Sequence, residues 1–204
     1  GGTGRHYLAR LNANGTLDGS FNPNPTANVN TISVQTDGRL IIGGAFVTIA
    51  GAARSGLARL NVDGTADEGF VPASNSDVYC TLLQADGRLI VGGQFTFIGG
   101  AEPRNGVARL GTGASSQSLT VPSSTRIEWL RGGACPEVQG VTFEISTNDG
   151  ASWSTLGGGT RLAGGWELVG LALPAQGQIR ARARFGGGVF NGSSGLAETR
   201  LSFD

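Results

Sequence analysis

The chain contains a long internal repeat, and this repeat constrains its fold more than any other feature. Gln35–Phe46 reads QTDGRLIIGGAF and recurs at Gln84–Phe95 as QADGRLIVGGQF. A shorter motif at Leu8–Leu11 recurs at Leu57–Leu60 and again at Val107–Leu110. A period of about 50 residues is typical of architectures in which each repeat is one supersecondary unit that stacks on its neighbours.

Each period is expected to form four short strands. Val29–Gln35 alternates apolar and polar side chains, as a half-buried strand does. Arg39–Phe46 is expected to pair with it across a two-residue turn at Asp37-Gly38. Gly56–Asn61 supplies a third strand, and a fourth ends near Phe70. Four strands in about 50 residues is the size of one β-propeller blade.

Two glycine pairs, Gly43-Gly44 and Gly92-Gly93, follow apolar runs at equivalent positions. Glycine inside a strand marks a bulge or a place where backbones crowd. A phosphate-binding loop is disfavoured, because no helical pattern follows either pair and the chain has no lysine. We therefore expect these glycines to lie where the inner strands of blades crowd around a shared axis.

Residues 5–110 resemble the delta-60 repeat family through these motifs. The resemblance implies a bacterial β-propeller repeat, secreted or surface-attached, whose biochemistry is largely unassigned, and it supplies no catalytic residues. Only about two periods are present, whereas closing a propeller takes about four or more blades. Gly1–Arg5 also aligns with Gly99–Arg104, inside a repeat. The expected partners are further blades of the same protein, or a homo-oligomer that completes the ring.

The period disappears after a small, polar stretch at residues 111–118, which is a predicted linker. Turn signals, among them Asn148–Gly150 and Asn191-Gly192, then separate seven strand candidates, a number that favours a β-sandwich. These candidates lie at residues 119–122, 125–131, 140–147, 152–156, 164–171, 177–185 and 196–203. The predicted fold is all-β, with about two four-stranded propeller-type blades in residues 1–110, forming an incomplete ring, and a sandwich in residues 119–204.

The C-terminal part is similar to fibronectin type III and immunoglobulin-like modules through Val141–Ser146 and Gly170–Arg184. It also looks like the module often attached to delta-60 repeats, through Trp129–Gly133 and Gly164–Trp166. Ser146–Trp153 resembles an Asp-box, with Asn148 and Ser152 in its polar positions. An Asp-box is a structural hairpin turn, so it does not indicate glycosidase activity.

Composition excludes several functions. Fifteen basic side chains balance fifteen acidic ones, so no basic excess favours nucleic acid. No apolar run is long enough to span a membrane. Cys80 and Cys135 are either a disulfide or, as we favour, two small buried hydrophobic residues. No zinc-ligand spacing is present, and no metal or cofactor is predicted.

Catalytic residues are not predicted either, so the chain is not expected to be an enzyme. A nucleophilic triad would need the single histidine, His6, close to the N-terminal end. Four carboxylates could in principle pair as acid and base, but in a strand-rich module they are expected to face solvent. These are Glu128, Glu137, Glu144 and Glu167.

Two sets of side chains are candidates for a ligand surface. Alternation places Arg180, Arg182 and Arg184 on one strand face, where they either bind an anionic glycan or pair with acids on a neighbouring strand. Three tryptophans either form a sugar-binding platform or pack in the core: Trp129, Trp153 and Trp166.

The predicted function is a non-catalytic structural or adhesive segment of a secreted or surface-attached bacterial repeat protein. The alternatives are a carbohydrate-binding module, with a cell-surface glycan as partner, and an accessory domain of an extracellular hydrolase.

Overall fold

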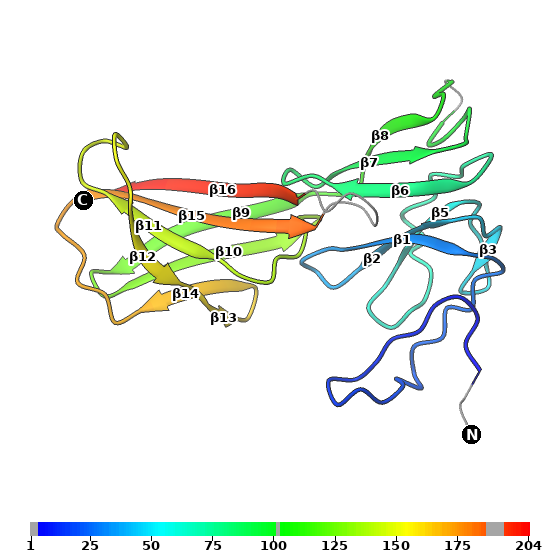
Figure 1. Ribbon diagram of the computed structural model, residues 1–204, viewed down its shortest axis with the longest axis horizontal. Coiled ribbons are helices and arrows are strands. Elements are labelled where there is room, and N and C mark those ends of the chain that lie inside the picture. The colour runs from blue at the N-terminus through cyan, green and yellow to red at the C-terminus, as the bar shows by residue number, and fades with distance from the viewer. Residues whose placement is uncertain (1–3, 101–102, 187–193) are drawn as a thin grey trace.

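The structure is a computed structural model that describes residues 4–100, 103–186 and 194–204. Its described residues form strands and no helix (Figure 1), which confirms the all-β class. The expected turn at Asn191-Gly192 lies outside the described residues. The strands are β1 (Val29–Val34), β2 (Leu40–Gly44), β3 (Thr48–Ile49), β4 (Ala52–Ala53), β5 (Leu57–Leu60), β6 (Val78–Leu83), β7 (Arg88–Gly93), β8 (Val107–Gly111), β9 (Ser115–Ser123), β10 (Arg126–Gly133), β11 (Thr142–Ser146), β12 (Ser154–Gly158), β13 (Thr160–Leu162), β14 (Gly165–Val169), β15 (Gly177–Gly186) and β16 (Ser194–Phe203).

The two repeats fold into matching antiparallel sheets, β1-β2-β5 and β6-β7-β8, here called blade 1 and blade 2. Four strands were expected in each, but each sheet has three. After β5 the chain makes a tight outer hairpin with a single bridge, Leu60 to Ala66, and a hydrogen bond from Asp67 N to Arg59 O of 2.8 Å. The predicted fourth strand is too short to extend the sheet beyond this bridge.

The hairpin turns differ from the predicted two-residue type. Gly38 N donates to Gln35 O and Gln35 N to Arg39 O, both at 2.9 Å, so three residues form the loop. Gly38 alone has positive φ, +82°, because a type I turn followed by one left-handed residue closes this loop. Asp37 Oδ1 accepts from Arg39 N at 3.0 Å, which accounts for the aspartate before the glycine.

The glycine pairs lie where backbones crowd, as predicted. A Cβ on Gly43 would meet Thr31 Cγ2 at 2.6 Å and Val78 Cγ1, from blade 2, at 2.7 Å. The inner strands β1 and β6 lie side by side, and Thr31 and Thr81 share a hydroxyl–hydroxyl hydrogen bond of 2.9 Å. Crowding of β2 against the next blade therefore requires glycine at position 43.

The residues after the repeats form two sheets, β13-β14-β10-β9 and β12-β11-β15-β16, which enclose one apolar core. Among the described residues of this region, eight strands replace the seven expected, because the chain turns at Gly159 and adds the short β13 at the edge. β8 ends at Gly111 and β9 begins at Ser115, so both enter the stretch expected to be a linker. Only residues 112–114 separate the last blade strand from the sandwich.

Two blade turns contact the sandwich, which lies beside the blades in Figure 1. Thr36 N donates to Cys135 O and Glu137 N to Val34 O, both at 2.9 Å. At the turn of blade 2, Ser115 Oγ donates to Asp86 O at 2.9 Å. Backbone hydrogen bonds between modules restrict rotation about residues 112–114.

Candidate functional site

Two successive repeats each carry an arginine–aspartate–phenylalanine group. Arg59 Nε donates to Asp67 Oδ2 at 2.8 Å, and its guanidinium lies 4.9 Å from the centre of the Phe70 ring. In the preceding repeat, Arg10 and Asp18 make the same 2.8 Å contact. Hydrogen bonds from Ser20 and then Arg10 lower the pKa of Asp18 to about 2. Arg10, Asp18 and Phe21 recur in the same order as Arg59, Asp67 and Phe70, but this recurrence alone does not show that the side chains touch.

The same arginines also join one repeat to the next. Arg10 Nη1 donates to Val62 O at 2.5 Å, and Arg59 Nη1 donates to Thr112 O, the equivalent carbonyl one repeat later. Phe70 packs in a core shared by both blades, with Ile41 and Val91 among its neighbours. The repeated charges therefore hold neighbouring repeats together.

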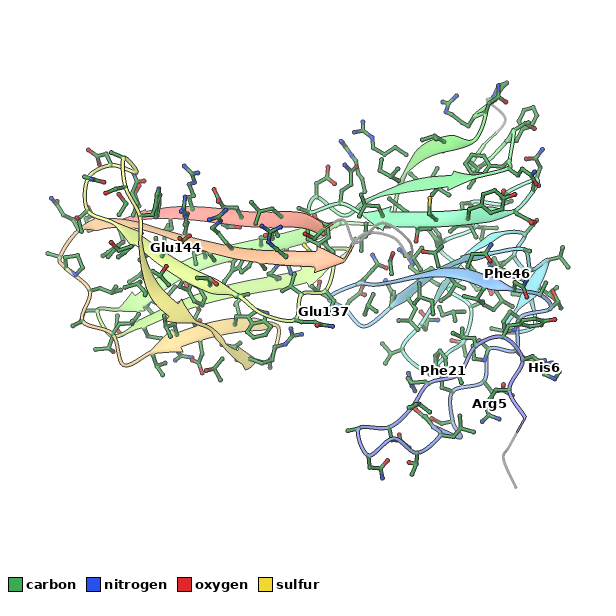
Figure 2. All side chains as sticks on the ribbon, viewed as in Figure 1. Arg5, His6, Phe21, Phe46, Glu137 and Glu144 are labelled. Carbon is green, nitrogen blue, oxygen red and sulfur yellow. The ribbon has the colours of Figure 1, made fainter. Side chains whose placement is uncertain are left out.

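The candidate catalytic side chains lie apart. Figure 2 shows His6 on the far side of the repeats from Glu144 in the sandwich, with Glu137 between the two modules. Each of the four candidate carboxylates forms an ion pair with an arginine. The pairs are Arg126 with Glu128 and Glu167 at 2.6 and 2.8 Å, Arg161 with Glu137 at 2.6 Å, and Arg180 with Glu144 at 2.6 Å.

The electrostatics of Glu137 and Glu144 do not favour proton donation. Hydrogen bonding from Arg180 lowers the pKa of Glu144. Burial raises the pKa of Glu137, but hydrogen bonds from Arg161 and Val138 N outweigh it and the net shift is downward. A general acid near neutral pH needs a raised pKa, so these two groups are ion-pair partners.

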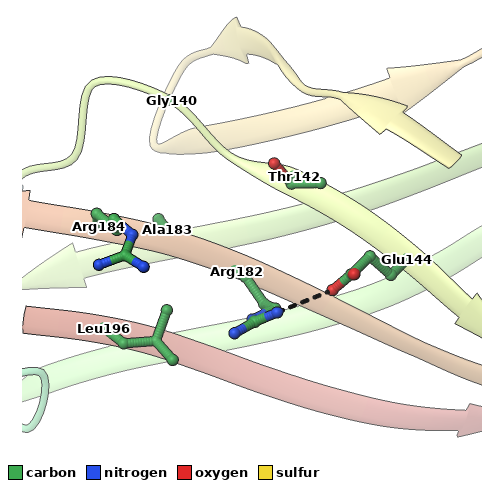
Figure 3. Close-up of a pocket in the computed structure, with 7 residues that line it drawn as sticks. All are labelled: Gly140, Thr142, Glu144, Arg182, Ala183, Arg184 and Leu196. Carbon is green, nitrogen blue, oxygen red and sulfur yellow. Dashed lines mark ion pairs between the residues drawn. The ribbon is translucent and has the colours of Figure 1, made fainter. Parts of the chain in front are cut away.

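Two members of the arginine row on β15, Arg182 and Arg184, line an open groove of about 420 Å³. Figure 3 shows Arg182 directed at Glu144, 3.6 Å away, with Arg184 farther along the strand. Arg182 also contacts Glu198 at 3.2 Å, and Arg184 donates to Ser194 Oγ at 3.1 Å. The row thus lies on one face, as alternation predicted, and acids on β11 and β16 neutralise much of its charge.

Two of the three tryptophans are buried. Trp129 and Trp166 face each other across β10 and β14 inside the sandwich core. Trp129 Nε1 donates to Thr199 Oγ1 at 3.1 Å, which satisfies its polar atom. Trp153 is half-buried, and the guanidiniums of Arg180 and Arg200 lie 4.3 and 5.5 Å from its ring centre.

The Asp-box-like segment forms the hairpin turn that its sequence predicted. Asn148 Oδ1 accepts from Ser152 N at 2.9 Å, and Asn148 Nδ2 donates to Ser152 Oγ at 2.8 Å. Trp153 Nε1 donates to Gly150 O at 3.1 Å. The polar residues therefore order the turn over the tryptophan.

Both cysteines are free thiols, Cys135 buried and Cys80 exposed, so the prediction of a buried residue fails for Cys80. Within residues 4–100, 103–186 and 194–204, no three His, Cys, Asp or Glu side chains gather as a metal ion would require. The same ranges contain no helix with the length and hydropathy to cross a membrane.

Comparison with protein families finds one match. Residues 1–21, 35–70 and 84–113 match a family described as a domain of unknown function (DUF5122) beta-propeller. No curated protein matches the chain. The matched segments contain the DG turns and the arginine–aspartate–phenylalanine groups described above. These three segments of the chain are thus similar to repeats of a β-propeller family.

Proposed function

We propose that this chain is a non-catalytic structural segment of a repeat protein, and that blade 2 receives a further propeller blade. The observation that carries the proposal is the contrast between the two blades. Several residues of blade 1 are buried by blade 2. The equivalent residues of blade 2 face solvent.

The clearest pair is Leu57 and Val107, which open the third strand of each blade. Leu57 is fully buried, whereas the side chain of Val107 is 65% exposed. Ile41 is buried against blade 2, while its equivalent Ile90 is only half-buried. Exposed apolar side chains in an otherwise packed repeat indicate an interaction surface. We call Cys80, Ile90, Val107 and Arg109 the open face.

Blade 1 has the complementary surface on its other side. Val34 on β1 is 43% exposed, whereas its equivalent Leu83 on β6 is 2% exposed because blade 1 covers it. Ile32 is likewise exposed, and its equivalent Thr81 is buried. Blade 2 thus exposes the surface that corresponds to the one by which blade 1 contacts blade 2. Blade 1 exposes the surface that corresponds to the one by which blade 2 contacts blade 1.

Arg109 extends the arginine series. Arg10 and Arg59 each donate to a carbonyl of the following repeat. Arg109 occupies the same position, and its guanidinium has no hydrogen-bond or ion-pair partner within the described ranges. A docked blade would supply that carbonyl together with apolar cover for Val107. A second copy of this chain and further repeats of the same protein are both sources of such a blade.

We propose that the sandwich is a fibronectin type III or immunoglobulin-like module. Support comes from the strand order: β9-β10-β14-β13 in one sheet and β11-β15-β16 in the other follow the A-B-E-D and C-F-G order of immunoglobulin-type sandwiches, with β12 added at the edge. Its contacts with both blade turns suit it to holding a fixed orientation relative to the blades.

Secretion or surface attachment, and an adhesive role, rest on the resemblance to delta-60 repeats. A sugar platform of three tryptophans is disfavoured, because Trp129 and Trp166 are buried and guanidiniums stack on Trp153. A glycan array with the wild type and Trp153→Ala tests the carbohydrate-binding alternative. Binding that depends on Trp153 would replace the structural proposal with that one.

The thiol of Cys80 reports on the open face directly. Its equivalent in blade 1, Thr31, is buried, whereas Cys80 is exposed. We expect a maleimide to label Cys80 quickly in the isolated chain. Labelling should be much slower in the assembled protein purified from its source organism. Buried Cys135 should react slowly in both samples and is the internal control. Equal labelling of Cys80 in both samples would contradict the proposal.

A further inference from the structure

A small polar cavity lies where the sandwich meets the turn of blade 1. It has a volume of about 40 Å³ and is lined by Thr36 from the blade and by Arg131, Glu137, Arg161 and Trp166 from the sandwich. Its walls thus come from both modules. None of the functions discussed above uses this site.

Arg131 is the unusual residue of this cavity. It is only 5% exposed, and its Nη1 donates to Pro136 O at 3.0 Å. Its Nε and Nη2 are buried and have no hydrogen-bond partner among the described residues. A buried charged donor without a hydrogen-bond partner strongly destabilises the folded state. Such a group is retained when something satisfies it.

The carboxylate in the cavity does not balance both arginines. Arg161 binds Glu137 in a bidentate pair, with Nη1–Oε1 and Nη2–Oε2 distances of 2.6 and 3.0 Å. Within the described residues, Arg131 has no carboxylate within ion-pair distance. Two guanidiniums and one carboxylate leave a net charge of one positive unit, and the open N–H groups belong to the buried guanidinium.

From these observations we propose that the cavity binds one monovalent, halide-sized anion held by the Nε and Nη2 groups of Arg131. A cavity needs roughly 10–15 Å³ to hold a single water, so about 40 Å³ accommodates a chloride ion but not a tetrahedral oxyanion with its four oxygens. Because Thr36 and Arg131 come from different modules, the bound anion stabilises the junction between blade 1 and the sandwich.

Thermal unfolding of the whole chain tests the site. Sodium chloride and sodium gluconate are compared at equal ionic strength, so that general screening cancels. We expect chloride, and not gluconate or sulfate, to raise Tm by about 3–5 °C for each tenfold increase above its dissociation constant. Arg131→Met should abolish this difference, while Arg200→Met, which removes an exposed guanidinium, should preserve it.

A second measurement serves if Arg131→Met does not fold. Crystals of the wild-type protein soaked in bromide should show an anomalous peak within hydrogen-bonding distance of Arg131 Nε and Nη2. Water alone at that position, or identical Tm values in chloride and gluconate, would overturn the proposal. Either result would leave the open face of blade 2, and the function proposed from it, unaffected.

Discussion

Gly43 and Gly92 provide a matched pair of mutations that isolates packing between blades. Both lie in the middle strand of their sheet, opposite Thr31 and Cys80 respectively. Neither has positive φ, so alanine fits the backbone at both positions. The pair differs in what surrounds a new methyl group, because blade 2 covers Gly43 and solvent borders Gly92.

The expected costs follow from those surroundings. In Gly43→Ala the methyl meets Thr31 Cγ2 at 2.6 Å and Val78 Cγ1 at 2.7 Å, and both are held in packed strands. Overpacking of this kind costs about 1–3 kcal/mol, which corresponds to a fall in Tm of about 2–12 °C for a chain of this size. In Gly92→Ala the methyl makes one close contact, with Cys80 Sγ at 2.7 Å.

Cys80 is exposed and its side chain can rotate away. The smaller conformational freedom of alanine in the unfolded chain offsets the remaining strain, so Gly92→Ala should change the free energy of unfolding by less than about 1 kcal/mol. Urea denaturation of the wild type and both variants, followed by circular dichroism, measures the difference. Equal destabilisation by the two substitutions would refute the assignment of one covered and one open blade face.

Three further outcomes are expected. Asp67→Asn leaves the buried Arg59 guanidinium without its carboxylate and should cost about 1–3 kcal/mol in urea denaturation; no loss would show that the pair does not stabilise the repeat. Asn148→Ala should cost about 1–2 kcal/mol by removing its hydrogen bonds to Ser152, whereas Asn148→Asp, which keeps the acceptor, should lose less. The pKa of Glu144 is lowered in the folded chain, so its pairing stabilises the fold above the unfolded pKa of about 4.3 and is lost as pH falls through the folded value. Tm measured from pH 7 to pH 3 should therefore fall more steeply for the wild type than for Glu144→Gln, and parallel curves would rule out this contribution.

The repeated half of the fold was largely predictable because its signals are local. A strand alternates every second residue, and a turn needs glycine at one position, so two copies of one pattern predict two copies of one sheet. The outer hairpin fell short of a strand because Asn61 to Thr65 closes the turn too soon for more than one bridge. Sequence alone does not set how many residues a hairpin pairs.

The sandwich and the ligand candidates depend on contacts distant in sequence. Ser115–Ser118 reads as a linker, but pairing with Leu130–Gly133 of β10 makes it part of β9. Trp129 and Trp166 are buried because the register of β10 and β14 turns both rings inward, which no local pattern shows. Arg180 and Glu144, by contrast, are on adjacent strands with alternating charges, and pairing with a neighbouring acid was one of the two outcomes expected from the sequence.

The central claim is that the open face of blade 2 is a blade-docking surface. A structure of the protein as isolated from its source tests it most directly. We expect a further β-sheet over Ile90 and Val107, with a backbone carbonyl accepting a hydrogen bond from the Arg109 guanidinium. Val107 and Arg109 still facing solvent in that assembly would contradict the account.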